Sequence, residues 1–299
     1  MTVQNGRNML RRTFLTGAAC LSAAPLLAQP RAPAFGDAAF RREVAALERA
    51  SRGRLGVAII DTASGARFAT RGAERFPMCS TFKLILAAAI LTRVDRGGER
   101  LDRRVAVAGS DMVPNSPVTE TRVGGFATVA ELCRATMTRS DNAAANLLLP
   151  AVGGPAGITR FARAVGDMHT RLDRIEPALN DVRPGDPRDT TTPSAMLELF
   201  RVLTLGPALK PASRDLFTRW LIANKTGDPR LRAGLPRNWR VGDKTGASGR
   251  GHDNDVAIIW PPARRPLLVA SYIADSPLEL AESNVVHARL GALIAGAVA

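Results

Sequence analysis

The feature that most constrains the fold is the position of the β-strand patterns, which occur only near the two ends of the chain. Residues 54–61 and 66–71 are rich in apolar residues and flank a turn at 62–65, which predicts a hairpin. Three further strands are predicted in the last quarter of the chain, at 239–244, 255–260 and 266–274. The middle shows only helical signals, so we expect no strand between Ser80 and Leu221.

Helical patterns fill the middle of the chain and also flank the predicted strands. They cover residues 37–52, 81–94, 128–138, 142–149, 158–165, 193–205, 213–222 and 278–297. The economical architecture is α/β plus all-α: an antiparallel five-stranded sheet flanked by helices and made by both chain ends, with an inserted all-α lobe. We expect the α/β lobe at 35–72 and 223–299, the all-α lobe at 73–222, and a site in the cleft between them.

The composition is that of a soluble globular protein, with 45% hydrophobic and 23% charged residues. The formal net charge is +14, and four arginines within residues 1–34 leave +10 for the remainder. The arginines are scattered and form no basic stripe with interleaved aromatic residues, so we expect a solvated basic surface and no nucleic-acid partner. Three cysteines do not make a disulfide framework.

Residues 1–34 have the pattern of a signal peptide. Arg7, Arg11 and Arg12 precede an apolar run at 14–27, and small residues follow it. The Arg11-Arg12 pair is typical of the twin-arginine export signal. We therefore expect cleavage between Ala28 and Ala34, a periplasmic or secreted protein, and no stable membrane insertion once the leader is removed.

Two short motifs bring together residues suited to nucleophilic catalysis. Ser80-Thr81-Phe82-Lys83 opens an apolar helix, which places the Ser80 hydroxyl and the Lys83 amine on one face. Lysine is rare here, at four residues, and unlike arginine it can lose its proton when buried. Ser140-Asp141-Asn142 lies between two helical segments and offers a hydroxyl and an amide. Alone, either motif is also explained as a helix cap.

A third motif, Lys244-Thr245-Gly246, ends a predicted strand, where glycine lets a ligand approach the backbone. The same tripeptide occurs at Lys225-Thr226-Gly227, where we expect Gly227 only to terminate the preceding helix. The strand context therefore selects Lys244.

In this order, the three motifs resemble the S-x-x-K, S-D-N and K-T-G set of the penicillin-recognising serine enzymes. Glu176-Pro177-Ala178-Leu179-Asn180 resembles the deacylation element of the class A serine β-lactamases. The resemblance covers the chain from about Asp37 to the C-terminus and implies a β-lactamase/transpeptidase-like fold. It also implies hydrolysis of penicillins and cephalosporins, antibiotic resistance, a monomer, and no metal or other cofactor.

The resemblance implies a covalent mechanism in which Ser80 attacks the lactam carbonyl. Lys83, or Glu176 through a water molecule, is the base that accepts the Ser80 proton, and both alternatives stay open. Ser140 passes a proton to the leaving nitrogen. The backbone N–H groups of Ser80 and Ala247 hold the oxyanion.

The resemblance also implies how the substrate and the hydrolytic water are held. Asn180 positions the water together with Glu176. Asn142 binds the amide side chain of the substrate, and Lys244 and Thr245 bind its carboxylate.

The predicted catalytic loop, residues 171–189, has features that match the same family. Arg174 and Asp189 match the ion pair that closes the loop, and Pro177 permits a cis peptide bond after Glu176. Many relatives carry an arginine on the strand after Lys244, whereas His252 and Asp253 occupy that stretch here. Arg230 resembles the substitute arginine of other members, against the alternative of one more surface arginine.

Two alternatives share the three motifs. A DD-peptidase acting on peptidoglycan uses the same acylation half of the mechanism, and a non-hydrolytic penicillin-binding protein only becomes acylated or docks. Glu176 with Asn180 favours the β-lactamase over both.

Overall fold

Both chain ends build one antiparallel sheet. The computed structural model describes residues 1–2 and 35–298, so the predicted signal peptide, its twin arginines and its cleavage site lie outside the described residues. The strands of the sheet are β1 (Arg54–Asp61), β2 (Arg67–Thr70), β7 (Arg240–Ala247), β8 (Asp253–Trp260) and β9 (Leu267–Ala274). Their order is β2-β1-β9-β8-β7, and every pair is antiparallel. The predicted five-stranded sheet is confirmed.

Strand β1 has an almost unbroken apolar sequence because the sheet is covered on both faces. Successive side chains of a strand point to opposite faces. Val57 and Ile59 belong to one core cluster, and Ala58 and Ile60 to the other.

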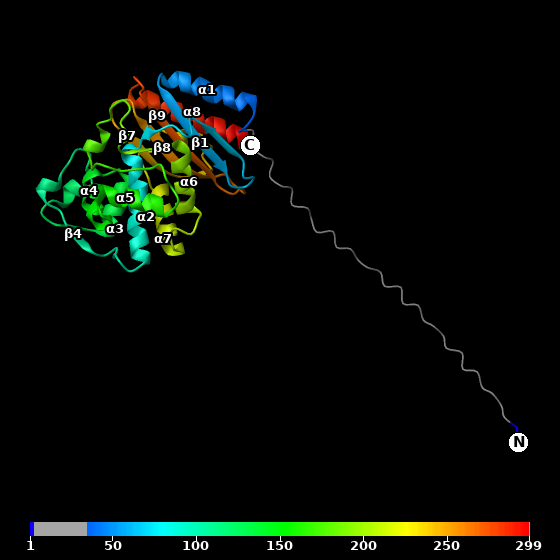
Figure 1. Cartoon of the computed structure of the whole chain (residues 1–299), viewed down its shortest axis with the longest axis horizontal. Coiled ribbons are helices and arrows are strands. Elements are labelled where there is room, and N and C mark those ends of the chain that lie inside the picture. The colour runs from blue at the N-terminus through cyan, green and yellow to red at the C-terminus, as the bar shows by residue number, and fades with distance from the viewer. Residues whose placement is uncertain (3–34, 299) are drawn as a thin grey trace.

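Two terminal helices, α1 (Ala38–Ser51) and α8 (Leu280–Val298), cover one face of the sheet (Figure 1). Phe40 of α1 and Leu290 of α8 lie in the same apolar cluster as Val57. The amphipathic pattern of α1 is explained by this packing, since only one of its faces is buried.

The other face of the sheet adjoins the helical region (Figure 1). Its helices are α2 (Phe82–Asp95), α3 (Val129–Thr138), α4 (Asn142–Leu148), α5 (Gly154–Ala164), α6 (Pro193–Thr204) and α7 (Pro211–Ile222). Helix α2 is buried on all sides from Phe82 to Thr92 and packs against α3, α4, α5 and α7. A helix without a polar face has to be central, and this one carries the first motif.

The expectation of no strand between Ser80 and Leu221 is wrong. Short strands β4 (Arg104–Ala106) and β5 (Phe126–Thr128) pair with each other, and β6 (Thr190–Thr191) pairs with β3 (Phe76–Pro77). Segments of two or three residues are too short to show a period of two, so their pairing is decided by distant partners.

Single turns of 3-10 helix connect the longer elements. They are η1 (Cys79–Thr81), η2 (Gly109–Asp111), η3 (Thr119–Arg122), η4 (Leu149–Val152), η5 (Ala178–Asn180) and η6 (Leu231–Gly234). Among the described residues, no helix is both long and apolar enough to cross a membrane.

Candidate active site

Ser80 lies in η1, the turn that runs into α2, and not in the α-helix itself as the sequence suggested. The preceding residue, Cys79, has a φ of 45°, a left-handed conformation that is uncommon for a residue with a side chain. Ser140 and Asn115, which also border the site, have φ values of 56° and 61°. Strained backbone of this kind is concentrated at functional sites, where the surrounding structure holds it in place.

Lys83 follows one turn after Ser80 and its side chain is completely buried. Its Nζ donates to the carbonyl of Ser140 at 2.8 Å and to Oδ1 of Asn142, and lies 3.1 Å from Oε1 of Glu176. Burial lowers the pKa of Lys83, while the charge of Glu176 opposes that shift.

Glu176 reaches the nucleophile from the long loop between α5 and α6. Its peptide bond to Pro177 is cis, as the sequence allowed. Oε1 accepts a hydrogen bond of 3.2 Å from Oγ of Ser80, and Oε2 accepts one of 2.7 Å from Nδ2 of Asn180 in η5. The side chain of Glu176 is completely buried, so its carboxylate acts on Ser80 with little screening by bulk solvent.

Asn146 was missed in the sequence. It lies on α4, where its Nδ2 donates to the carbonyl of Glu176 at 2.8 Å and its Oδ1 accepts from the Glu176 N–H at 3.1 Å. These two bonds fix the main chain that carries the carboxylate. The only available signal was a polar residue within the apolar run Ala143–Leu149.

The second motif faces the third across the site. Lys244, which is fully buried, donates through Nζ to Oγ of Ser140 at 3.0 Å and to the carbonyl of Thr245 at 2.7 Å. Burial lowers the pKa of Lys244 well below its usual range, and the nearby charge of Lys83 lowers it further. Ser140 is therefore an acceptor for an amine whose proton is weakly held.

A cavity of about 780 Å³ opens over these residues. Of the predicted site residues, those that line it are Ser80, Ser140, Asn142, Asn180, Arg230, Thr245 and Ala247. Lys83, Glu176 and Lys244 are buried beneath it. The volume is in the range of sites that enclose a small molecule.

Thr226 of the Lys225-Thr226-Gly227 tripeptide lines this cavity, whereas Lys225 does not, and the expectation that Gly227 only ends a helix is wrong. Helix α7 ends at Ile222 with Ala223 as its cap. Thr226 lines the cavity, and its Oγ1 lies 2.5 Å from Oγ1 of Thr245. A Cβ atom at Gly227 would lie 1.8 Å from Oδ2 of Asp243, so this close approach is what requires glycine.

Arg230 is not a surface arginine, because only 4% of it is exposed. Its Nη1 donates to the carbonyl of Gly246 at 2.9 Å and to that of Asn254, and its Nε donates to Oδ1 of Asn284 at 2.9 Å. Asp253 lies 3.8 Å away. The guanidinium is thus held at the end of β7 that borders the cavity.

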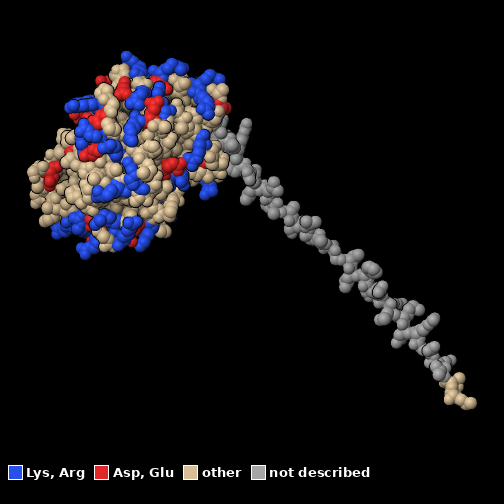
Figure 2. Space-filling model, viewed as in Figure 1, with Lys and Arg blue, Asp and Glu red and all other residues tan. Residues whose placement is uncertain are grey.

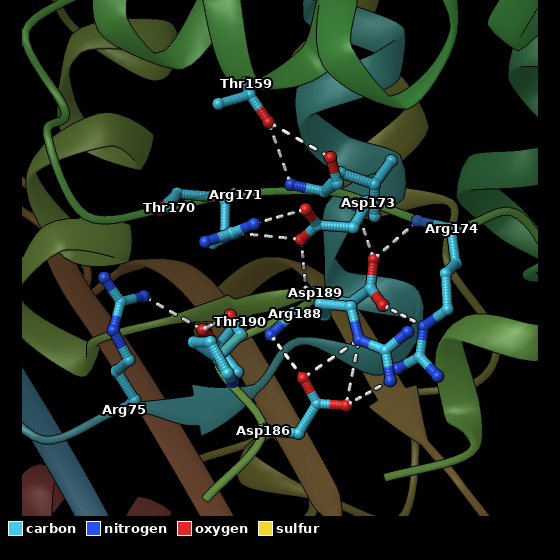
Figure 3. Close-up of polar contacts among 12 residues, drawn as sticks. Arg75, Thr159, Thr170, Arg171, Asp173, Arg174, Asp186, Arg188, Asp189 and Thr190 are labelled. Atoms are coloured by element: carbon cyan, nitrogen blue, oxygen red, sulfur yellow. Dashed lines mark hydrogen bonds and ion pairs between the residues drawn. The ribbon is translucent and has the colours of Figure 1, made fainter.

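The loop that carries Glu176 is closed at its neck by Arg174 and Asp189 (Figure 3). Nε of Arg174 donates to Oδ2 of Asp189 at 2.6 Å, and the side chain of Asp189 is 1% exposed. Oδ1 of Asp189 also accepts from the backbone N–H groups of Asp173 and Arg174. The predicted pair therefore exists, and it is reinforced by the main chain.

The arrangement suits nucleophilic catalysis by serine. A hydroxyl contacts a buried carboxylate, two buried amines lie within reach of a second hydroxyl, and a cavity exposes both hydroxyls. Within residues 1–2 and 35–298, no group of three or more His, Cys, Asp or Glu side chains is placed to hold a metal ion.

Comparison with known proteins gives the family. A model of the β-lactamase enzyme family matches residues 39–298. The chain is 47% identical to β-lactamase L2 of Stenotrophomonas maltophilia over 294 residues, which are 95% of this chain and 97% of the relative. It is 46% identical to β-lactamase CTX-M-8 of Citrobacter amalonaticus, over 93% of this chain and 94% of the relative.

Solved structures agree with this result. An ancestral class A β-lactamase (GNCA) superimposes with a TM-score of 0.84 at 59% identity, covering 86% of this chain and 98% of that one. A β-lactamase from Xanthomonas campestris gives a TM-score of 0.86 at 51% identity, covering 87% and 98%. The chain belongs to the class A serine β-lactamases.

Proposed function

We propose that this protein hydrolyses the β-lactam bond of penicillins and cephalosporins through an acyl-enzyme on Ser80, and thereby gives antibiotic resistance. The observation that carries the proposal is the contact of Glu176 with both Ser80, at 3.2 Å, and Asn180, at 2.7 Å. The Glu176 carboxylate is thus hydrogen-bonded to the nucleophile through one oxygen and to Asn180 through the other.

In the acylation step, Ser80 transfers its proton to Glu176 as its oxygen bonds to the lactam carbonyl. The direct hydrogen bond between the two side chains supports Glu176 as this base. Lys83 stabilises the buried carboxylate from 3.1 Å. The backbone N–H groups of Ser80 and Ala247 hold the carbonyl oxygen as it becomes negative.

The carbon–nitrogen bond then breaks, and Ser140 gives its hydroxyl proton to the leaving nitrogen. The Nζ atoms of Lys244 and Lys83 lie 3.0 and 3.5 Å from Oγ of Ser140, so either amine can return a proton to it. The lowered pKa of both lysines makes this transfer easier.

Deacylation uses the other oxygen of Glu176. Asn180 donates to Oε2, and we infer that these two side chains hold a water molecule beside the ester carbonyl of Ser80. Lys83, which lies 3.1 Å from Glu176, first takes up the Ser80 proton and so makes good the proton passed on to Ser140. Glu176 then takes a proton from that water, whose oxygen bonds to the ester carbonyl carbon. The ester C–O bond breaks, and Glu176 returns the proton to the oxygen of Ser80. A relative without this pair forms the ester but does not release it quickly.

The remaining residues of the cavity bind the substrate. Lys244, Thr245 and Arg230 bind its carboxylate, since charge-assisted contacts of this kind are the strong ones. Asn142 binds its amide side chain.

The test is the variant Glu176→Ala mixed with benzylpenicillin. The ester should form slowly and then persist, so mass spectrometry should find a stable adduct on the peptide that contains Ser80. Steady turnover should fall by about 10²- to 10⁴-fold. Glu43→Ala, which removes an exposed glutamate of α1, is the matched control and should behave as the parent protein does.

Turnover of Glu176→Ala at the parent rate would contradict the mechanism. A parent protein that itself accumulates the adduct and hydrolyses no penicillin would instead identify a DD-peptidase or a non-hydrolytic penicillin-binding protein.

The proposal includes the export of the chain and its division into two lobes. Residues 1–34 direct the chain to the periplasm by the twin-arginine route, where it acts as a monomer without nucleic acid. Residues 35–72 with 223–299 form the α/β lobe, and 73–222 form the all-α lobe with the catalytic loop. Replacing Arg11 and Arg12 by lysine should abolish periplasmic activity, and unchanged export would contradict the route.

A further inference from the structure

A second cavity, of about 630 Å³, lies where α3 and η3 meet the segment that follows α7. Helices α3 and α7 pack together within the helical region (Figure 1). The cavity shares no lining residue with the cavity at Ser80. Its volume lies in the range of small-molecule sites.

The lining of this cavity is strongly cationic around an apolar floor. Four cations, Arg122, Arg134, Arg139 and Lys225, face one acid, Glu131. Arg122 and Glu131 form an ion pair of 3.1 Å. Within the described residues, Arg122 is the only one of these four cations with a carboxylate within ion-pairing distance. The floor consists of buried Ala127, Leu132 and Ala135.

Figure 2 shows that cationic side chains outnumber acidic ones over the visible face of the molecule. Elsewhere on the surface, many arginines are neutralised by an acid in direct contact, as Arg171 is by Asp173, whose side-chain atoms lie 2.6 Å apart. The second cavity differs from these neutralised surface regions. Its four cations surround an apolar floor and face a single carboxylate.

Hydrogen bonds connect the wall of this second cavity to the residues that border the active site. Thr119, in its wall, binds the carboxylate of Asp141 through its N–H at 2.9 Å and its hydroxyl at 2.7 Å. Asp141 lies between Ser140 and Asn142. Thr119 thus contacts directly the motif that borders the catalytic cavity.

A second connection runs through Lys225. Its backbone N–H donates to the carbonyl of Thr138 at 3.2 Å, which joins the two walls of the second cavity. The next residue, Thr226, contacts the hydroxyl of Thr245 at 2.5 Å. Two consecutive residues thus line different cavities, Lys225 the second cavity and Thr226 the cavity at Ser80.

We propose that the second cavity is a regulatory site for a small amphipathic anion, such as an aromatic carboxylate, whose binding changes turnover at Ser80. The apolar floor takes the ring, and Arg134, Arg139 and Lys225 bind the carboxylate by charge-assisted hydrogen bonds. Charge complementarity selects an anion, since four cations against one carboxylate give the lining a net positive charge.

Calorimetry with 2-naphthoate tests the site without using turnover. The parent protein should bind one naphthoate there, and the double variant Arg134→Ala, Lys225→Ala should bind it about tenfold more weakly. Neutral 2-naphthamide should bind the parent protein more weakly by a similar factor. The matched control, Arg42→Ala with Arg237→Ala, removes two exposed arginines elsewhere and should leave the affinity unchanged.

Absence of binding, or equal binding by the parent and the Arg134→Ala, Lys225→Ala variant, would overturn the site. Equal binding would show that the naphthoate binds elsewhere on the protein. Neither result bears on whether the protein hydrolyses β-lactams, so this arm is independent of the proposed function.

Turnover of a chromogenic cephalosporin tests whether binding in the second cavity affects catalysis at Ser80. Saturating naphthoate should change kcat by about fivefold or more in the parent protein, and the double variant should need about ten times more naphthoate for the same change. The basal kcat of the double variant should be unchanged. A change in KM alone would indicate competition at Ser80, and an unchanged kcat with naphthoate bound would overturn the regulatory role.

Discussion

Nζ of Lys83 lies 3.1 Å from Oε1 of Glu176, and neither side chain is exposed at all. This contact joins the central helix α2 to the loop between α5 and α6. A buried ion pair is costly to break on one side, because the remaining charge has no partner. The position of the loop is therefore tied to the helix that follows the nucleophile, and changes that move Glu176 should affect both.

Asn146 provides the first prediction, because it holds the main chain of Glu176 by two hydrogen bonds. Asn146→Ala should lower the free energy of unfolding by about 1–3 kcal/mol and slow deacylation more than acylation. Stopped-flow measurement of the two steps with benzylpenicillin checks this. Asn238→Ala, at an exposed position, is the control. Equal slowing of both steps would show that Asn146 does not position Glu176 for the water.

At the neck of the catalytic loop, replacing Asp189 should lower the free energy of unfolding more than replacing Arg174. Asp189→Ala removes the acceptor of three donors and places alanine at a φ of 57°, so it should cost about 3 kcal/mol or more. Arg174→Ala should cost less, about 1–2 kcal/mol, because both backbone N–H groups still bind Asp189.

Urea unfolding of the two neck variants gives both values. Asp102→Ala, which removes an exposed acid paired with Arg100, should change the free energy of unfolding by less than about 0.5 kcal/mol. A larger loss for Arg174→Ala than for Asp189→Ala would contradict the dominant role of the carboxylate.

Arg230 should affect both substrate binding and stability. Arg230→Ala removes a cation next to the cavity and should raise KM for penicillins by about tenfold, with a smaller change in kcat. It also removes the ion-pair partner of Asp253 and a donor to two backbone carbonyls, so the midpoint of urea unfolding should fall. An unchanged KM in a folded variant would restrict Arg230 to holding β7 and β8 together.

His287 should make the protein sensitive to acid. The ring is fully buried between Ser271 and the carbonyl of Asp253, and burial lowers its pKa to about 3. The unfolded chain has the ordinary value of about 6.5, so between pH 6.5 and 3 it binds a proton that the folded protein does not. His287 therefore contributes a loss of stability as the pH falls through this window, by up to about 1.4 kcal/mol per pH unit.

The comparison that checks this is urea unfolding of the parent and of His287→Gln at pH 7 and pH 4.5. The variant should be less stable at pH 7 but should lose less stability on acidification. Equal losses in both proteins would assign the acid sensitivity to other groups.

Much of the fold was determined by the local sequence. The strand patterns at the two chain ends gave the five-stranded sheet, because alternation and apolar content are properties of neighbouring residues. Helix α2 begins at Phe82, one residue from the predicted start, and α4 begins at Asn142 as predicted. The three motifs, together with the element from Glu176 to Asn180, also identified the family, which the relatives confirm. The roles of the individual residues stay predictions.

Only the tertiary structure decided how the site is put together. Ser80 and Glu176 are 96 residues apart, and their contact depends on how the loop packs against α4 through Asn146. The burial of Arg230 and the place of Thr226 in the cavity wall also arise from contacts with β7. A local pattern records which face a residue prefers, but it does not record which distant segment will cover that face. The chemistry was therefore readable in the sequence, whereas the geometry that supports it came from long-range packing.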